Sequence, residues 1–222
     1  MSAHLKKEIE HLKKELLTLC GMVEEHLWQA VKSIKKRDVN LAQEVIDGDI
    51  DIDQMEVKVE EECLKILALY QPVAIDLRFI ITALKINSDL ERIGDLAVNI
   101  AERSLFLSTQ KPVDMPFDFE LMAEKTQAML KKSLDALVNL DSALAKEVCG
   151  ADDEIDSMNR KMYDQVKKQT KQDPENIEIL IHLLSISRHL ERIADHATNI
   201  AEDVIYMIKG DIVRHKTENY RS

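Results

Sequence analysis

Apolar residues recur every three or four positions along most of the 222-residue chain. Ile52, Met55 and Val59 are one example of this spacing, which is typical of a helix that buries one face. Short polar or proline-containing stretches interrupt the pattern and mark its ends. The pattern predicts helices at residues 4–36, 39–47, 50–69, 73–107, 118–139, 142–149, 152–171 and 175–209.

The two halves of the chain repeat each other. Residues 90–102 (LERIGDLAVNIAE) return as residues 190–202 (LERIADHATNIAE), with ten identities in thirteen positions at an offset of 100. Residues 41–45 (LAQEV) match residues 144–148 (LAKEV) at an offset of 103. The difference of three residues therefore falls in the loops before the last helices, where insertions are tolerated.

Each half contains enough amphipathic helix to enclose a core of its own. The sequence therefore predicts an all-α fold of two tandem three-helix bundles related by internal duplication. We expect the first bundle at residues 1–107, a turn-rich linker at residues 108–117 and the second bundle at residues 118–222. Asp38 and Asp141 precede helices at matching positions and are expected N-caps.

Composition narrows the classes of function. Aromatic residues make up only 4%, and there are five glycines and four prolines, which favours helix over strand. A net charge of −11 argues against binding nucleic acid and favours a cation or a cationic partner. Uncharged stretches such as 79–84 and 179–187 are far shorter than the ~20 residues of a membrane span. With Cys20, Cys63 and Cys149 expected as reduced core residues, we expect a soluble cytoplasmic protein.

The two repeated helices carry matching polar faces opposite their apolar faces. These positions are Glu91, Asp95 and Asn99 in the first copy and Glu191, Asp195 and Asn199 in the second. Two carboxylates at i and i+4 repel each other mildly, yet together they can hold one cation or bridge two. The alternative is a solvated face, with Arg92 paired to Asp95 and Arg192 paired to Asp195. We take both faces as candidate metal sites.

The preceding helix offers further carboxylates. Glu56 and Glu60 share the i, i+4 spacing in the first copy, whereas the aligned residues of the second copy are Asn159 and Tyr163. A second site would have to borrow from Asp156 or Asp164, or be less acidic. We therefore expect equal folds but unequal metal sites.

Other conspicuous residues are expected to be structural. His182, His189 and His196 recur every seven residues at the edge of the apolar face, where packing or interface contacts are expected. Trp28 lies in an apolar helical pattern and is expected in the core. The chain has no P-loop, no dinucleotide fingerprint, no nucleophile elbow and no pair of Glu-x-x-His motifs, so we do not expect an enzyme.

The chain resembles the PhoU family of phosphate-signalling regulators. The resemblance rests on residues 71–78 (QPVAIDLR), both Glu-Arg-Ile-x-Asp motifs and residues 209–215 (KGDIVRH). It implies a homodimeric negative regulator of phosphate uptake and phosphate-starvation signalling. Such an adaptor would connect the ATPase of the phosphate ABC transporter with the phosphate-sensing histidine kinase, in peripheral contact with the membrane.

The resemblance also implies a multinuclear metal cluster, because some family members hold one on Glu/Asp-x-x-x-Asp helices. Iron is the first candidate, and zinc, nickel, manganese and magnesium are alternatives. Glu91, Asp95, Glu191 and Asp195 match that motif. Two other functions remain open: a carboxylate-bridged metal oxidoreductase, and a purely structural helical dimer whose acidic faces carry only solvated charge.

Overall fold

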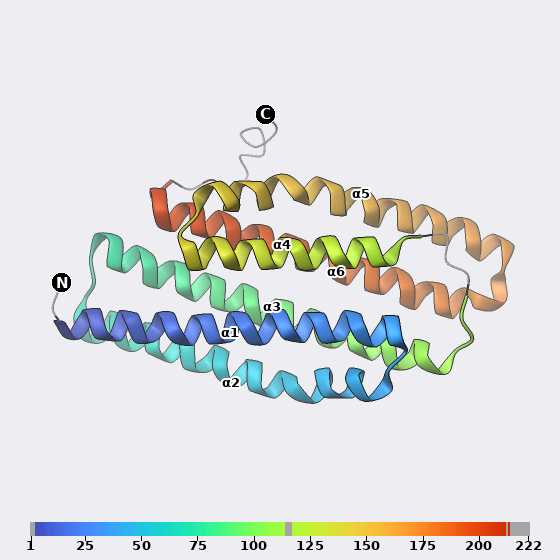
Figure 1. The fold of residues 1–222 in the computed structure, drawn as a ribbon, viewed down its shortest axis with the longest axis horizontal. Coiled ribbons are helices and arrows are strands. Elements are labelled where there is room, and N and C mark those ends of the chain that lie inside the picture. Colours follow the sequence, from blue (N-terminus) through green and yellow to red (C-terminus); the bar gives the residue numbers. More distant parts are fainter. Residues whose placement is uncertain (1–2, 114–116, 212, 214–222) are drawn as a thin grey trace.

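The computed structural model describes residues 3–113, 117–211 and 213, so part of the closing 209–215 motif lies outside the described residues. Its helices are α1 (Ala3–Lys36), α2 (Val39–Tyr70), α3 (Ala74–Thr109), α4 (Phe119–Asn139), α5 (Ser142–Gln172), the short 3-10 helix η1 (Pro174–Asn176) and α6 (Ile177–Lys209). Figure 1 shows α1, α2 and α3 in one bundle and α4, α5 and α6 in a second beside it. The prediction of two tandem three-helix bundles is confirmed.

In each bundle an aspartate caps the beginning of the second helix, Asp38 for α2 and Asp141 for α5. The Asp38 carboxylate accepts a hydrogen bond from the Leu41 backbone N–H at 3.1 Å, and Asp141 accepts from Ala143 and Leu144 at 2.8 and 3.1 Å. Each cap satisfies N–H groups that have no partner inside the helix. Both expected caps are confirmed.

The middle helix of each bundle is continuous. The predicted breaks at residues 48–49 and 150–151 are wrong, since α2 and α5 run through them. A helical glycine costs only about 1 kcal/mol relative to alanine, which the packing of a long helix easily offsets. Gly48 also lies against α1, because a Cβ there would be 3.6 Å from Cε1 of His26.

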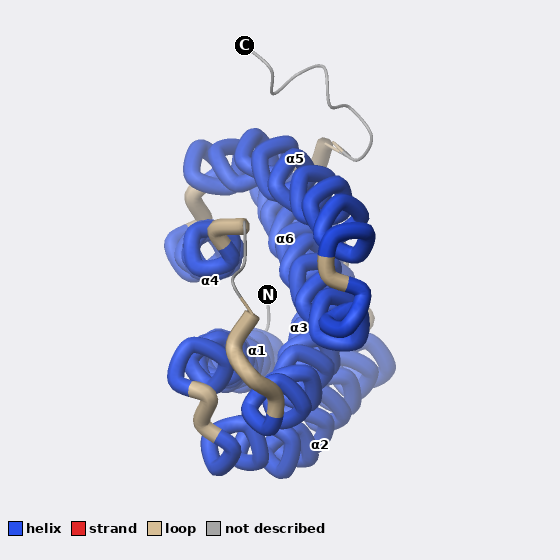
Figure 2. The backbone as a smooth tube through the Cα atoms, turned by 90° about the vertical axis from the view of Figure 1, so that its right-hand side faces the viewer, coloured by secondary structure: helices blue, strands red, loops and turns tan. Residues whose placement is uncertain are grey.

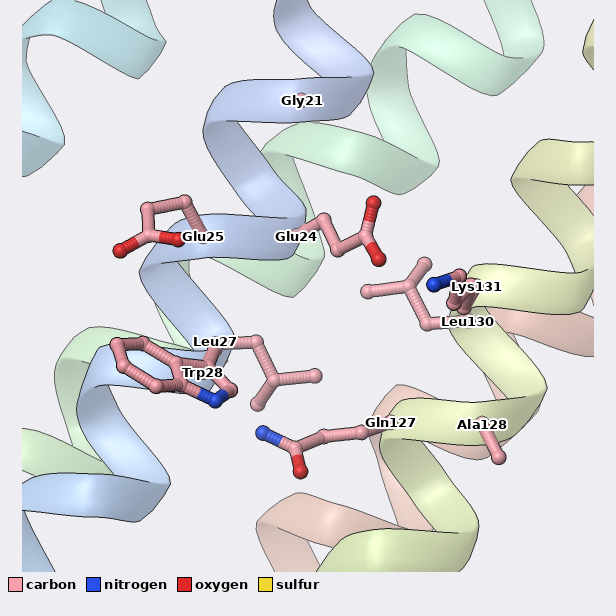
Figure 3. A pocket seen from close by; sticks show the side chains of 9 residues that line it. All are labelled: Gly21, Glu24, Glu25, Leu27, Trp28, Gln127, Ala128, Leu130 and Lys131. Atoms are coloured by element: carbon pink, nitrogen blue, oxygen red, sulfur yellow. The ribbon is translucent and has the colours of Figure 1, made fainter.

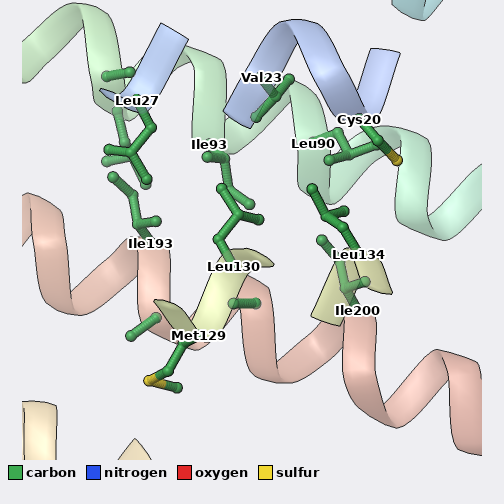
Figure 4. Packing of buried hydrophobic residues seen from close by; sticks show 14 of the residues in the cluster. Cys20, Val23, Leu27, Leu90, Ile93, Met129, Leu130, Leu134, Ile193 and Ile200 are labelled. Atoms are coloured by element: carbon green, nitrogen blue, oxygen red, sulfur yellow. The ribbon is translucent and has the colours of Figure 1, made fainter. Parts of the chain in front are cut away.

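The two bundles share one core along the pair α3 and α6. Figure 2 shows these two helices next to each other between α2 and α5. In Figure 4, side chains from α1, α3, α4 and α6 meet, among them Leu90, Ile93, Leu130 and Ile193, all at most 1% exposed. The two repeats therefore depend on each other for burial of their third helices.

Two residues of the histidine stripe make contacts across this junction, in line with the expected packing role. Nδ1 of His196 is 2.8 Å from Oδ1 of Asp89 on α3, and the His182 ring stacks on Phe106 with centroids 3.8 Å apart. His189 is half-buried on the same side of α6. His182 and His196 therefore join the two bundles. Within the described residues, no helix combines the length and the apolarity of a membrane span.

Two glycines give a direct test of the continuity of α1 and of the end of α6. Gly21 is exposed in the middle of α1, and a Cβ added there would meet nothing within 4 Å, so Gly21→Ala should raise the unfolding free energy by about 0.5–1 kcal/mol. Gly210 ends α6 with φ of 79° beside Arg78, so Gly210→Ala should lower it by about 1 kcal/mol. Urea denaturation measures both. A loss of stability in Gly21→Ala would contradict the continuous α1.

Candidate functional site

Five carboxylates gather where α2 meets α3. We call Asp49, Asp53 and Glu56 of α2 together with Glu91 and Asp95 of α3 the first cluster. Partial burial, and then the charges of Asp53, Asp95 and Glu91, raise the pKa of Asp49 to about 6. Burial also raises the pKa of Glu91, with Asp95 as the next cause. The carboxylates of the two helices therefore repel one another across the helix pair.

A second cluster occupies the same place in the other bundle. It consists of Asp152 and Asp156 on α5 with Glu191 and Asp195 on α6. The pKa of Asp152 is raised to about 6 by burial and then by Asp195 and Asp156. The pKa of Asp195 is raised to about 6 by burial and then by Glu191 and Asp156. Both repeats thus concentrate negative charge between their second and third helices.

The metal ligands expected from the sequence did not include Asp49, Asp53 or Asp152. At the offset of 103, Asp49 and Asp53 correspond to Asp152 and Asp156, so both copies carry Asp-x-x-x-Asp on the second helix. The repeat offset alone would have found them. The two sites are therefore more alike than expected, because the expectation compared only the positions of Glu56 and Glu60.

Glu56 and its counterpart have a packing role. Nδ2 of buried Asn87 donates to Oε1 of Glu56 at 2.9 Å and to its backbone oxygen at 3.0 Å. At the matching place, Oγ of Ser187 donates to Oδ1 of Asn159 at 2.9 Å. Either side chain can accept this bond between helices. Glu60 lies exposed one turn further on and repels Glu56.

The two candidate asparagines have other contacts. Nδ2 of Asn99 donates to the backbone oxygen of Asp95 at 2.7 Å. Nδ2 of Asn199 lies 3.4 Å from Oδ1 of Asp89, across the junction between the bundles. The structure therefore places their amide groups at the helix backbone and at the junction.

Arginines balance part of the charge. Arg92 lies 3.3 Å from Asp95 and 3.4 Å from Glu91, as the solvated-face alternative expects, but its side chain is 56% exposed. Such exposed pairs contribute only about 0–1 kcal/mol. Asp156 has a similar exposed partner in Arg160 at 3.4 Å. Most of the repulsion inside each cluster is therefore left without a counter-charge of comparable burial.

The donors suit a hard or borderline cation, which prefers carboxylate oxygen with or without imidazole nitrogen. As the side chains are placed, no three His, Cys, Asp or Glu groups in the described ranges form a ready ion site. Binding would thus require half-exposed carboxylates to rotate. One buried atom already points to a missing partner: Nε2 of His26, 3.9 Å from Oδ1 of Asp49, makes no hydrogen bond within the described part of the chain. Burial lowers the pKa of His26 to about 4.

A pocket that is separate from both clusters lies between α1 and α4. Figure 3 shows Leu27 and Trp28 of α1 facing Gln127 and Leu130 of α4. Trp28 is 46% exposed, with Nζ of Lys32 3.9 Å from its ring centroid, so its predicted core position was wrong. The two helices pack less closely here than α3 and α6 do. Among the described residues that line this pocket, none belongs to either cluster.

The duplicated bundle with two carboxylate clusters defines a class of tandem-repeat, all-helical proteins. The family model described as "PhoU domain" matches residues 16–104 and 119–204. The chain belongs to the PhoU family. It is 41% identical over 210 residues to the "Phosphate-specific transport system accessory protein PhoU homolog" of Aquifex aeolicus, covering 95% of each chain.

Solved structures agree with this assignment. The crystal structure of PhoU from Pseudomonas aeruginosa matches with a TM-score of 0.89 and 36% identity, over 93% of this chain and 99% of that one. The phosphate transport system regulatory protein PhoU from Streptococcus pneumoniae matches with a TM-score of 0.84 and 30% identity, over 94% and 99%. The fold implied by the sequence resemblance is therefore confirmed.

The raised pKa values predict that metal-free protein gains stability when a cluster carboxylate is neutralised. An aspartate whose native pKa is raised costs stability once it ionises, so Asp152→Asn should raise the unfolding free energy at pH 7.5 by about 1 kcal/mol. The gain should shrink as the pH falls through about 6 toward 4, where Asp152 itself becomes neutral. Urea denaturation with chelator present measures this difference.

The matched control is Asp51→Asn, which removes an exposed carboxylate on α2 outside both clusters. It should change the unfolding free energy little across this pH range. Equal pH profiles for the two variants would refute the crowding of charge in the second cluster.

Proposed function

We propose that the protein is a non-catalytic adaptor that represses phosphate uptake and phosphate-starvation signalling. In this proposal a cytoplasmic homodimer docks on the ATPase of the phosphate ABC transporter and on the phosphate-sensing histidine kinase. The observation that carries it is the family match in both repeats, together with relatives named as accessory proteins of phosphate-specific transport. The match over nearly the whole length of both chains supports transfer of that role.

We further propose that each cluster binds metal, with iron first among the candidates. The ligands would come from Asp49, Asp53, Glu91 and Asp95 in the first repeat, and from Asp152, Asp156, Glu191 and Asp195 in the second. A bound cation would supply the positive charge that each cluster lacks and would tie its second helix to its third. Zinc, nickel, manganese and magnesium suit the same oxygen donors as alternatives.

The adaptor is favoured over the carboxylate-bridged oxidoreductase by the surroundings of the clusters. An oxidoreductase needs a substrate cavity beside its metal. In the described part of the chain, the surface pockets that border α1 and α4 are lined by no cluster residue. The clusters themselves lie in half-exposed positions, which suit charge balance and contact with a partner. The hypothesis of a purely structural dimer does not explain why each cluster brings mutually repelling carboxylates together.

A deletion strain tests the regulatory role. Deletion should derepress a phosphate-starvation reporter in phosphate-rich medium at least several-fold, and the wild-type chain should restore repression. The double variant Asp95→Asn with Asp195→Asn should fail to restore it, because each cluster loses one carboxylate. The control, Asp51→Asn with Asp164→Asn, changes exposed carboxylates outside the clusters and should restore repression.

The outcomes separate the two parts of the proposal. An unchanged reporter in the deletion strain would contradict the regulatory role. Full repression by the Asp95→Asn, Asp195→Asn variant would contradict a role for the carboxylate clusters and leave the adaptor intact. Co-purification of the tagged wild-type chain with the transporter ATPase and the kinase would support the proposed partners, and its failure with both would count against them.

A further inference from the structure

One histidine reaches the first cluster from α1, the helix of that bundle that supplies none of its carboxylates. His26 is 7% exposed, so its imidazole is almost wholly enclosed by α1 and the helices packed on it. Its Nε2 atom is buried and has no hydrogen-bond partner among the described residues. Leaving a buried polar nitrogen without a partner is unfavourable, which calls for a physical reason.

The distance to the cluster points to that reason. Nε2 of His26 and Oδ1 of Asp49 are 3.9 Å apart, which is too long for a hydrogen bond. It is within the span of about 4.2 Å that two ligands of one zinc-sized ion can reach at about 2.1 Å each. A shift of the half-buried Asp49 carboxylate by about half an ångström would give the spacing of tetrahedral ligands.

Two glycines, Gly48 on α2 and Gly94 on α3, lie close to His26 and Asp49. A Cβ on Gly48 would meet the His26 ring at 3.6 Å, and one on Gly94 would lie 3.5 Å from Oδ1 of Asp49. Both glycines lie inside helices, where glycine is less favourable than alanine. At these distances an added Cβ would make ordinary van der Waals contact, so the imidazole and the carboxylate both lie close to the backbone at the two glycines.

The second repeat lacks this arrangement. The first and fourth helices align at an offset of 103, which places buried Met129 where the first repeat has His26. The same offset aligns Ala151 of the second repeat with Gly48 of the first. At the offset of 100, Ala194 replaces Gly94. The imidazole and the two nearby glycines are therefore found together in the first repeat and are replaced together in the second.

We propose that Nε2 of His26 is a nitrogen ligand of the metal in the first cluster. The first site then has mixed nitrogen and oxygen donors, which select borderline ions such as Zn²⁺, Co²⁺ and Fe²⁺. The second site has only carboxylate oxygens, so its preference is shifted toward harder ions such as Mn²⁺ and Mg²⁺ relative to the first site. This inference rests on the proposed metal binding and assigns different metals to two sites of equal fold.

Cobalt binding to the full-length chain tests the assignment. The background variant Asp152→Asn with Asp195→Asn disables the second cluster, so Co²⁺ added to chelator-treated protein reports on the first. Cobalt-edge X-ray absorption should show the outer-shell scattering of a coordinated imidazole. His26→Met, which copies the residue of the second repeat, should remove that signal and weaken Co²⁺ binding by about 10- to 100-fold.

A gain-of-ligand variant tests the same idea without removing a buried side chain from the first repeat. With the first cluster disabled by Asp49→Asn and Asp95→Asn, Met129→His with Ala151→Gly should give the second site the imidazole signal. Circular dichroism checks whether each variant is folded. If His26→Met does not fold, the gain-of-ligand variant decides the matter alone.

The possible results distinguish the role of His26 from metal binding by the clusters as such. Imidazole scattering that disappears in His26→Met, or that appears in the gain-of-ligand variant, supports the assignment. Tight Co²⁺ binding without an imidazole signal in the background variant would overturn the role of His26 and leave the metal-binding proposal standing. No Co²⁺ binding to either cluster of the wild-type chain would overturn both.

Discussion

The packing of α3 against α6 determines which faces of the two helices are buried and where their acidic residues lie. Leu90, Ile93 and their counterparts Leu190 and Ile193 are fully buried, so each third helix commits its apolar face to the shared core. The repeated polar positions of those helices must then face away from that core, toward the edge of α2 or α5. Burial of apolar surface, the largest favourable term in folding, thereby offsets the repulsion of the carboxylates it brings together.

This arrangement explains which features could be predicted from the sequence. The repeat, the helical spacing and the caps at Asp38 and Asp141 are properties of one segment or of two aligned segments, so the sequence alone predicts them. The continuity of α2 through Gly48 depends on contact with α1, and local propensity does not contain that contact. The exposure of Trp28 depends on how closely α1 and α4 approach each other, which no single helical pattern predicts.

The sequence predicts only part of the candidate site, because contacts between helices are not contained in the pattern of one helix. A helical wheel finds Glu91 and Asp95 because they lie on one helix, but it cannot show which residues of α2 face them. Asp49 and Asp53 become visible in the sequence only when the offset of 103 is applied to every acidic position. His26 gives no signal at all, because a single histidine in an apolar helix is more often a packed core residue. Its relation to Asp49 exists only in three dimensions.

The central claim is that a bound cation relieves the repulsion in the two carboxylate clusters. Thermal unfolding of chelator-treated protein in rising Mn²⁺ measures this most directly. We predict that the melting temperature of the wild-type chain rises by about 5–10 °C when Mn²⁺ reaches about 100 times its Kd. The variant Asp95→Asn with Asp195→Asn should show little or none of this rise. An equal rise in both proteins, or no rise in the wild type, would contradict the claim.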